Sequence, residues 1–124
     1  MEKSRDGILL LDERGAVRYA TPATKLVLGF DPDALVGLDV YSFVHPDDLS
    51  LARRRLGASF ARPGEDVPVT LRMTAADGRP RLVELTAVNR LDDPSVRAVV
   101  VNYRDVTERD ATARELHRQH ALLE

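Results

Sequence analysis

The run His45-Pro46-Asp47-Asp48 is the first place in the chain where residue types and spacing could do chemistry. A histidine beside two carboxylates can ligate a metal ion or act as a general base. The same residues also suit the start of a helix, because proline fits the first turn and carboxylates meet the positive end of the helix dipole. We interpret the run as a helix N-terminus and not as a catalytic or metal site.

No other set of residues completes a reactive centre. His117 and His120 stand three apart near the C-terminus without an acidic or cysteine partner at zinc-site spacing, so we interpret them as a solvated or interface face. The absence of cysteine excludes disulfides, thiolate metal sites and cysteine nucleophiles. The sequence also lacks a phosphate-binding glycine loop and a serine nucleophile elbow. We therefore predict no metal site and no catalysis by this chain itself.

Size and composition indicate one small globular domain. A chain of 124 residues allows one core, and 44% apolar with 31% charged residues is ordinary for a globular protein. No apolar run approaches the roughly 20 residues that span a bilayer, and the N-terminus does not read as a signal peptide. The net charge of −2 gives no electrostatic footprint for nucleic acid. We expect a cytoplasmic protein whose segment here contacts neither membrane nor nucleic acid.

Hydrophobic alternation and turn residues divide the chain into strands and short helices. Two extended stretches around a turn cluster predict a hairpin over residues 7–20. Thr21-Pro22 and Asp31-Pro32 each place a capping residue before a proline, and a glycine ends each short helix that follows. The remaining elements are a helix over 49–60 and strands over 67–74, 83–87 and 98–103. The order is two strands, a few helices, three antiparallel strands and a terminal helix, which predicts an α+β fold.

The last strand passes directly into the terminal helix at Asp105 and Thr107. Short oxygen-bearing side chains at such a junction can accept hydrogen bonds from the unpaired amides of a first helical turn. Thr107 and Asp110 also form a weak capping-box pattern. A sheet that continues into a helix through a stiff, capped joint is suited to transmit movement, so we assign Asp105 and Thr107 to a signal relay.

The order of elements and a set of short motifs resemble the PAS domain, a sensor module common in bacterial signalling proteins. The resemblance covers roughly residues 6–109 and is specific because the motifs occur together in the right order. They are Asp6-Gly7-Ile8, Leu28-Gly29-Phe30, Leu35-Val36-Gly37, His45-Pro46-Asp47-Asp48, Asp77-Gly78 and Asp105-Val106-Thr107. Thr21 departs from the asparagine that the family often carries, although threonine can also cap the helix. The resemblance implies a five-stranded antiparallel sheet with short helices on one face and a C-terminal linker helix.

In PAS domains the inner sheet face and the facing helix enclose a cavity. Carried onto this chain, the inward positions are Leu56, Phe60, Val69, Leu71, Met73, Val83, Leu85, Ala87, Val99, Val101 and Tyr103. Nearly all of them are apolar, so a cavity lined by them would suit an apolar or amphipathic small molecule held by burial. The alternative is that these side chains fill one another's space as an ordinary core.

The resemblance also allows the familiar PAS cofactors to be tested against this sequence. Flavin-adduct and cinnamate-type members need a cysteine, which this chain lacks; Val40 stands at the matching flavin position. Haem-binding members use a histidine from the long helix, and residues 49–60 contain none. Citrate-type members need a basic cluster in the cavity, whereas we expect Arg53, Arg54 and Arg55 to be solvated. We predict no prosthetic group, and leave open an unidentified apolar ligand.

The terminal helix carries a heptad-like seam of residues spaced alternately three and four apart. Its positions are Val106, Arg109, Ala113, Leu116, His120 and Leu123. Isolated helices of this length are marginal in water, so a partner helix is required, and we expect a homodimer. The alternative is a frayed tail.

These observations predict residues 1–105 as a PAS sensor domain and 106–124 as a signalling linker helix. We interpret the chain as a regulatory sensor and dimerisation module of a multidomain bacterial signal-transduction protein, with a downstream effector in the same chain. A sensor histidine kinase, a diguanylate cyclase and a transcription regulator are the effector types considered. The alternative is a constitutive protein-interaction module with a filled core and no ligand.

Overall fold

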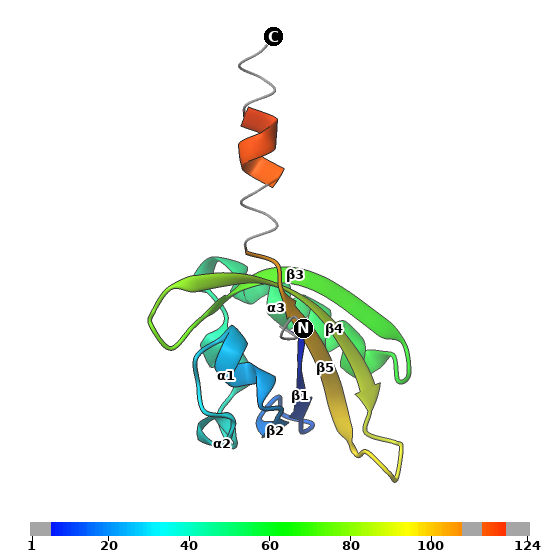
Figure 1. Cartoon of the computed structure of the whole chain (residues 1–124). Helices are drawn as coiled ribbons and strands as arrows, with labels where there is room; N and C mark the ends of the chain where they lie inside the picture. The colour runs from blue at the N-terminus through cyan, green and yellow to red at the C-terminus, as the bar shows by residue number, and fades with distance from the viewer. Residues whose placement is uncertain (1–5, 108–112, 119–124) are drawn as a thin grey trace.

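The computed structural model describes residues 6–107 and 113–118, and it shows a five-stranded antiparallel sheet with helices on one face (Figure 1). The elements are β1 Asp6–Leu11, β2 Val17–Ala20, α1 Ala23–Val27, α2 Pro32–Leu35, η1 Val40–Phe43, η2 Pro46–Asp48, α3 Leu49–Ala61, β3 Asp66–Thr74, β4 Pro80–Arg90 and β5 Ala98–Asp105. Residues 113–118 are helical as well. The α+β class, the strand count and the short helices on one face are confirmed.

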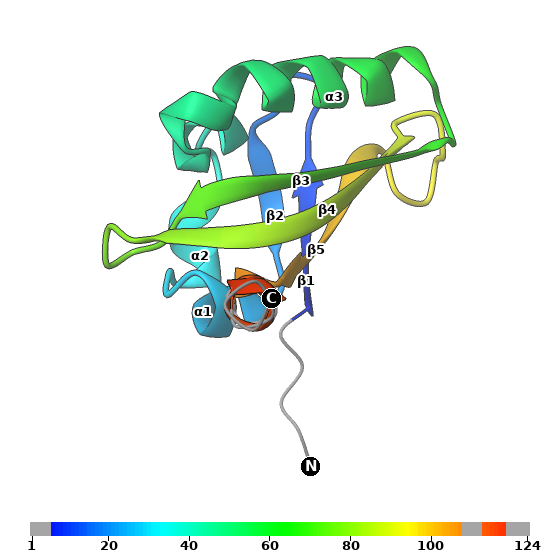
Figure 2. The ribbon, with the colours of Figure 1, turned by 90° about the horizontal axis from the view of Figure 1, so that it is seen from above.

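The strands lie in the order β2-β1-β5-β4-β3, so the first and last strands of the chain pair in the middle of the sheet. The sheet is strongly twisted, and β1 and β2 run steeply across the direction of β3 and β4 (Figure 2). The hairpin predicted for residues 7–20 is confirmed as β1–β2. The Asp77-Gly78 turn joins β3 to β4, and Gly78 has the positive φ of 82° that such a turn requires.

Pairing registers place the alternating apolar residues in rows across the inner face. One row runs Leu9, Val101, Ala87 and Val67, from β1 through β5 and β4 to β3. The next row runs Gly7, Tyr103, Leu85 and Val69. Because side chains alternate between faces, this register buries one complete set of residues and leaves the other set on the outer face.

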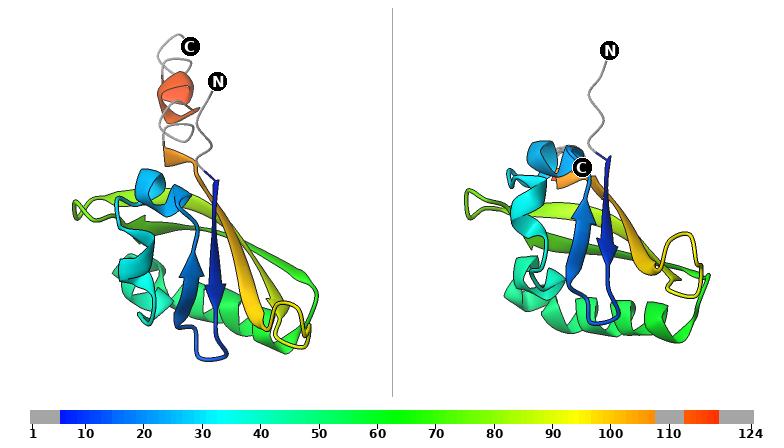
Figure 3. Two further views of the ribbon diagram at one scale, coloured as in Figure 1. Left: turned by 60° about the horizontal axis from the view of Figure 1, so that its bottom comes forward. Right: turned by 90° about the horizontal axis from the view of Figure 1, so that it is seen from below.

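The helices cover the inner face in two groups. Helix α3 lies along β3, while α1 and α2 lie beside β1 and β2 (Figure 3). Leu56 of α3, Val27 of α1 and Leu35 of α2 are all buried in the same core cluster. Since α1, α2 and α3 all contribute apolar side chains to one cluster, the sheet and these three helices form a single packed unit.

The helix cap predicted for Thr21 is wrong. Helix α1 has no side-chain cap hydrogen bond in the described structure. Thr21 Oγ1 instead accepts a hydrogen bond from Ile8 N at 3.0 Å, and Thr21 N donates to Ile8 O at 3.0 Å. The threonine therefore extends the β1–β2 pairing by one position, because its hydroxyl is used by the neighbouring strand.

Gly7 permits a close approach at the centre of the sheet. A Cβ atom built on Gly7 would overlap the ring of Tyr103, which faces it across the β1–β5 pair. Gly57 in α3 has no atom within 4 Å of the corresponding position. The two glycines therefore have opposite structural roles, the first required by packing and the second merely tolerated in a helix.

Gly7→Ala should lower the free energy of unfolding by about 1–3 kcal/mol, since the added methyl overpacks a buried ring. Gly57→Ala is the matched control and should raise it by up to about 1 kcal/mol, because alanine favours the helix. Urea unfolding followed by circular dichroism measures both. Equal stability of wild type and Gly7→Ala would contradict the tight packing of Tyr103 on Gly7.

Candidate functional site

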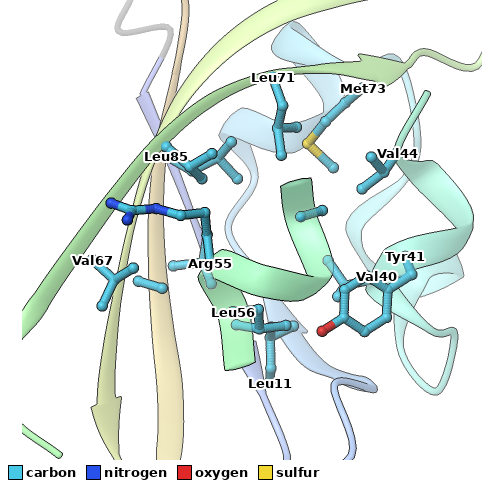
Figure 4. Close-up of a pocket in the computed structure, with 14 residues that line it drawn as sticks. Leu11, Val40, Tyr41, Val44, Arg55, Leu56, Val67, Leu71, Met73 and Leu85 are labelled. Carbon is cyan, nitrogen blue, oxygen red and sulfur yellow. The ribbon is translucent and has the colours of Figure 1, made fainter. Parts of the chain in front are cut away.

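A small apolar cavity of about 50 Å³ lies between α3, the η1 segment and the inner face of β3, β4 and β5. Seven of the sequence-predicted pocket residues line it, namely Leu56, Val69, Leu71, Met73, Leu85, Ala87 and Val101. Figure 4 shows Leu71, Met73 and Leu85 on one side of the space, with Leu56 and Tyr41 opposite. Ligand pockets usually measure about 300–1,000 Å³, so most of the inner face is filled core around a small void.

The other four predicted residues are also on the inner side but do not line this cavity. Val83, Val99 and Tyr103 are fully buried in the core, and Phe60 is partly buried against it. The structure therefore divides the predicted set in two. One group surrounds the void, and the other packs beneath or beside it.

Several cavity residues were missed from the sequence, including Leu11, Val40, Tyr41, Val44 and Arg55. The η1 segment is short and irregular, so it offers no periodicity that would assign an inward face. Arg55 was expected to be solvated with its two neighbours, but it is half-buried and lines the cavity. Its position three residues after Ala52 and four before Ser59, on the buried side of α3, was the available signal.

The side chains of Tyr41 and Arg55 are the polar groups that border the apolar space. The guanidinium of Arg53 lies 4.5 Å from the centre of the Tyr41 ring, a cation–π contact. Burial raises the pKa of the Tyr41 hydroxyl, so the phenol is neutral near pH 7. Arg55 Nε and Nη2 both donate to the carbonyl oxygen of Pro68, at 3.1 and 2.6 Å. Arg55 therefore joins α3 to β3 at the cavity wall.

The residues first considered for chemistry fix the start of α3. His45 Nδ1 accepts from Asp47 N at 3.1 Å, as expected of a helix N-terminus, and His45 N donates to Arg72 O at 2.9 Å. Asp48 faces β3 and accepts from Arg72 N, Nε and Nη2 at 2.8–2.9 Å. The hydrogen bonds from the Arg72 side chain hold the pKa of the Asp48 carboxyl below its usual range. This pair fastens the N-terminus of α3 to the edge of the sheet.

Tyr103 links β5 to α1. Its hydroxyl lies 2.6 Å from Thr24 Oγ1, and both residues are almost completely buried. Burial raises the pKa of the Tyr103 hydroxyl, so it remains neutral near pH 7, and one of the two hydroxyls donates a hydrogen bond to the other. A buried hydroxyl pair of this kind fixes the position of the strand relative to the helix.

The two relay residues make different hydrogen bonds at the exit of β5. Asp105 Oδ1 accepts from Thr107 N at 2.9 Å, as predicted for a helix start. Thr107 Oγ1 accepts from Leu82 N at 2.8 Å, so its hydroxyl binds β4. Val106 N also donates to Leu82 O at 2.8 Å. The junction is therefore tied to the beginning of β4; Asp110 of the proposed capping box lies outside the described residues.

The predicted seam of the terminal helix is only partly described. Val106 is buried in the domain at 3% exposure, so its side chain already has neighbours in the monomer. Ala113 and Leu116 are exposed, Leu116 at 62%. Arg109, His120 and Leu123 lie outside the described residues. An exposed leucine on a helix is an available contact for a partner.

Two further findings concern metal sites and membrane-spanning helices. Within residues 6–107 and 113–118, no three histidine, cysteine or acidic side chains come together as a metal site would need. No helix in the same ranges has the length and apolar character to cross a membrane.

Comparison with known proteins gives one family and several structural neighbours. A model of the PAS fold matches residues 1–106, whereas the comparison with curated proteins returned no match. A PAS domain from Colwellia psychrerythraea has a TM-score of 0.74 at 18% identity, covering 84% of this chain and 88% of its own. The PAS domain of the quorum-sensing receptor RpfR of Cronobacter turicensis, in complex with BDSF, has a TM-score of 0.68 at 18% identity, with 86% and 99% covered.

A sensory box histidine kinase/response regulator from Burkholderia thailandensis is also similar. Its TM-score is 0.70 at 21% identity, and the match covers 97% of this chain and 91% of that one. At these identities the structural likenesses establish the fold.

Asp48→Asn should make stability less sensitive to acid. The Asp48 carboxyl has a lowered pKa in the folded state. The folded state therefore binds fewer protons than the unfolded state below about pH 5. The stability that the ionised Asp48 contributes is lost as the pH falls through the folded-state pKa. The variant should show a lower thermal midpoint at pH 7 and a shallower decline towards acid. Asp47→Asn is the control, since the exposed Asp47 interacts with Arg72 only through its charge, whereas Asp48 accepts the hydrogen bonds. Parallel pH profiles for wild type and Asp48→Asn would contradict this assignment.

Proposed function

The chain belongs to the PAS family, and we propose that it is a regulatory sensor and dimerisation domain of a multidomain signalling protein. Strand β5 carries this proposal. Three alternate residues along it are Val101 at the cavity, Tyr103 in the buried contact with α1, and Asp105 at the exit. One strand thus connects the cavity, where we propose that a ligand acts, to the junction with the terminal helix.

The proposed mechanism begins with a change in what the cavity contains. A ligand that favours one position of β5 would shift the strand, and the shift would reach Asp105 and Thr107 through the backbone. Such a ligand changes the equilibrium only by its difference in affinity for the two arrangements. The hydrogen bonds to Leu82 make the exit sensitive to the relative position of β4 and β5.

The output part of the proposal is a paired terminal helix leading to an effector domain in the same chain. Leu116 is exposed and lies on the predicted seam, which supports a helix partner supplied by a second copy. The neighbours include a sensory histidine kinase/response regulator and a quorum-sensing receptor, which supports a signalling context. Reactions of such a protein would belong to the effector, and we assign none to this domain.

The competing function is a constitutive interaction module, and the size of the cavity favours it. A void of about 50 Å³ is small beside the usual ligand pocket. On this alternative, the inner face is simply a core with a packing defect. The two functions differ in whether filling the void changes the terminal helices.

Filling the cavity by substitution tests the sensor proposal without knowledge of a ligand. Ala87→Val adds two methyl groups at the cavity wall, and His117→Cys supplies a spin-label site in a chain without other cysteines. We expect the distance between labels in the dimer to change by about 1–2 Å or more, as for other helix shifts at subunit interfaces. Pulsed electron spin resonance measures it.

Two further substitutions separate relay from general disturbance. Thr86→Val alters the outer face of the same strand and should leave the label distance unchanged. Thr107→Val removes the hydroxyl that binds Leu82 and should suppress the effect of Ala87→Val. An unchanged distance in Ala87→Val would favour the constitutive module, and the absence of any dimer distance would refute the dimerisation part.

A further inference from the structure

Arg55 lies at the boundary between the internal cavity and the surface. Together with Val69 it lines both the cavity and an outer groove along α3 and the edge of β3. Figure 4 shows the Arg55 stem beside the cavity and its guanidinium directed towards β3. Arg55 and Val69 therefore lie between the apolar space and the outer groove.

The hydrogen bonds of Arg55 form a strap from α3 to β3, between the cavity and the outer groove. Both bonds end on one neutral acceptor, the carbonyl oxygen of Pro68 on the edge strand. Pro68 is exposed, so its carbonyl can be hydrated when the arginine leaves. Opening the strap therefore exchanges two accessible hydrogen bonds for solvent contacts.

The charge of Arg55 has no carboxylate partner within the described part of the chain. Helix α3 itself contains no acidic residue between Leu49 and Ala61. A guanidinium binds a carboxylate through two parallel charge-assisted bonds, which are stronger than bonds to a neutral carbonyl. An incoming carboxylate would thus replace a weaker partner with a better one.

The geometry points to a small apolar monocarboxylic acid as the ligand, with its tail in the cavity and its carboxylate on Arg55. This inference rests on the proposed sensor function and specifies the chemistry of the signal. The tail must be short, because the space is about 50 Å³ before any rearrangement. Met73 lines the space, and its flexible thioether can move to enlarge it.

Calorimetric titration of the full 124-residue chain with matched acids and alcohols tests the inference. Butanoate, hexanoate and octanoate are compared with butanol, hexanol and octanol. We expect each acid to bind about tenfold more tightly than its alcohol, in keeping with a charge-assisted pair. Affinity should rise about three- to fourfold per methylene until the cavity is full.

Arg55→Gln should remove the preference for acid over alcohol, while Arg54→Gln should retain it. Arg54 is the matched control because it is the adjacent arginine on α3 and lines the outer groove but not the cavity. A thermal melt of each variant verifies folding. If Arg55→Gln does not fold, the acid-to-alcohol ratio of wild type still decides the question.

Equal affinity of acids and alcohols for wild type would overturn the carboxylate inference but leave a ligand-binding sensor in place. Equal loss of acid binding in both variants would also overturn it, since that result indicates general charge attraction. Binding of neither series would overturn it as well, and the spin-label experiment with Ala87→Val would then decide separately whether the domain is a sensor.

Discussion

Strand β5 pairs with β1 on one side and β4 on the other, and the rest of the structure depends on these backbone hydrogen bonds. Through β1 it fixes the position of α1, and through β4 it fixes the long hairpin that faces α3. The pairing also requires Gly7, since only a residue without a side chain leaves room for Tyr103. Because β5 ends the sheet in sequence yet lies at its centre, the segment that follows it begins from the most constrained part of the molecule.

Helix α3 is attached to β3 at two places of unequal strength. Near its start, the Asp48 carboxylate accepts three hydrogen bonds from Arg72. Two come from the guanidinium and join charged side chains, and the third comes from the backbone N–H. About two turns further on, Arg55 binds only the carbonyl of the exposed Pro68. The first attachment includes bonds between two charged side chains, so we expect the second, which ends on a neutral carbonyl, to break more readily. The cavity lies behind the weaker attachment.

Much of the fold could be predicted from the sequence, because the signals are local. Alternation along residues 67–74 and 83–87, with Asp77-Gly78 between them, specified the β3–β4 hairpin and its buried face. The pairing of β1 with β5 had no local signal, and the resemblance implied only a five-stranded antiparallel sheet without that strand order. Thr21 shows the same limit at one residue: its hydroxyl was assigned to the nearest helix, but the strand partner Ile8, distant in sequence, uses it.

The candidate site was predicted less completely for a similar reason. Residues on regular strands could be placed by alternation, and six of them line the cavity together with Leu56 of α3. Val40, Tyr41 and Val44 close it from a segment without periodicity, so no pattern gave their orientation. Arg55 was grouped with Arg53 and Arg54 by residue type, although helical geometry separates neighbours by about 100° and places Arg55 nearest the buried face of α3. In this chain, charge alone suggested a solvated face, whereas position on the helix determined which arginine meets the core.

The small volume of the cavity bears on how a signal could be transmitted. Densely packed walls respond to even one added methylene, because neighbouring side chains have little free space in which to relax. Val101 and Ala87 belong to such walls and lie on the two strands that meet at the exit. Leu82 of β4 and Thr107 after β5 are hydrogen-bonded there, so a relative movement of the two strands must strain or break that contact. A nearly filled core is therefore compatible with the sensor function that we propose, because a ligand in so small a space would have to displace these walls.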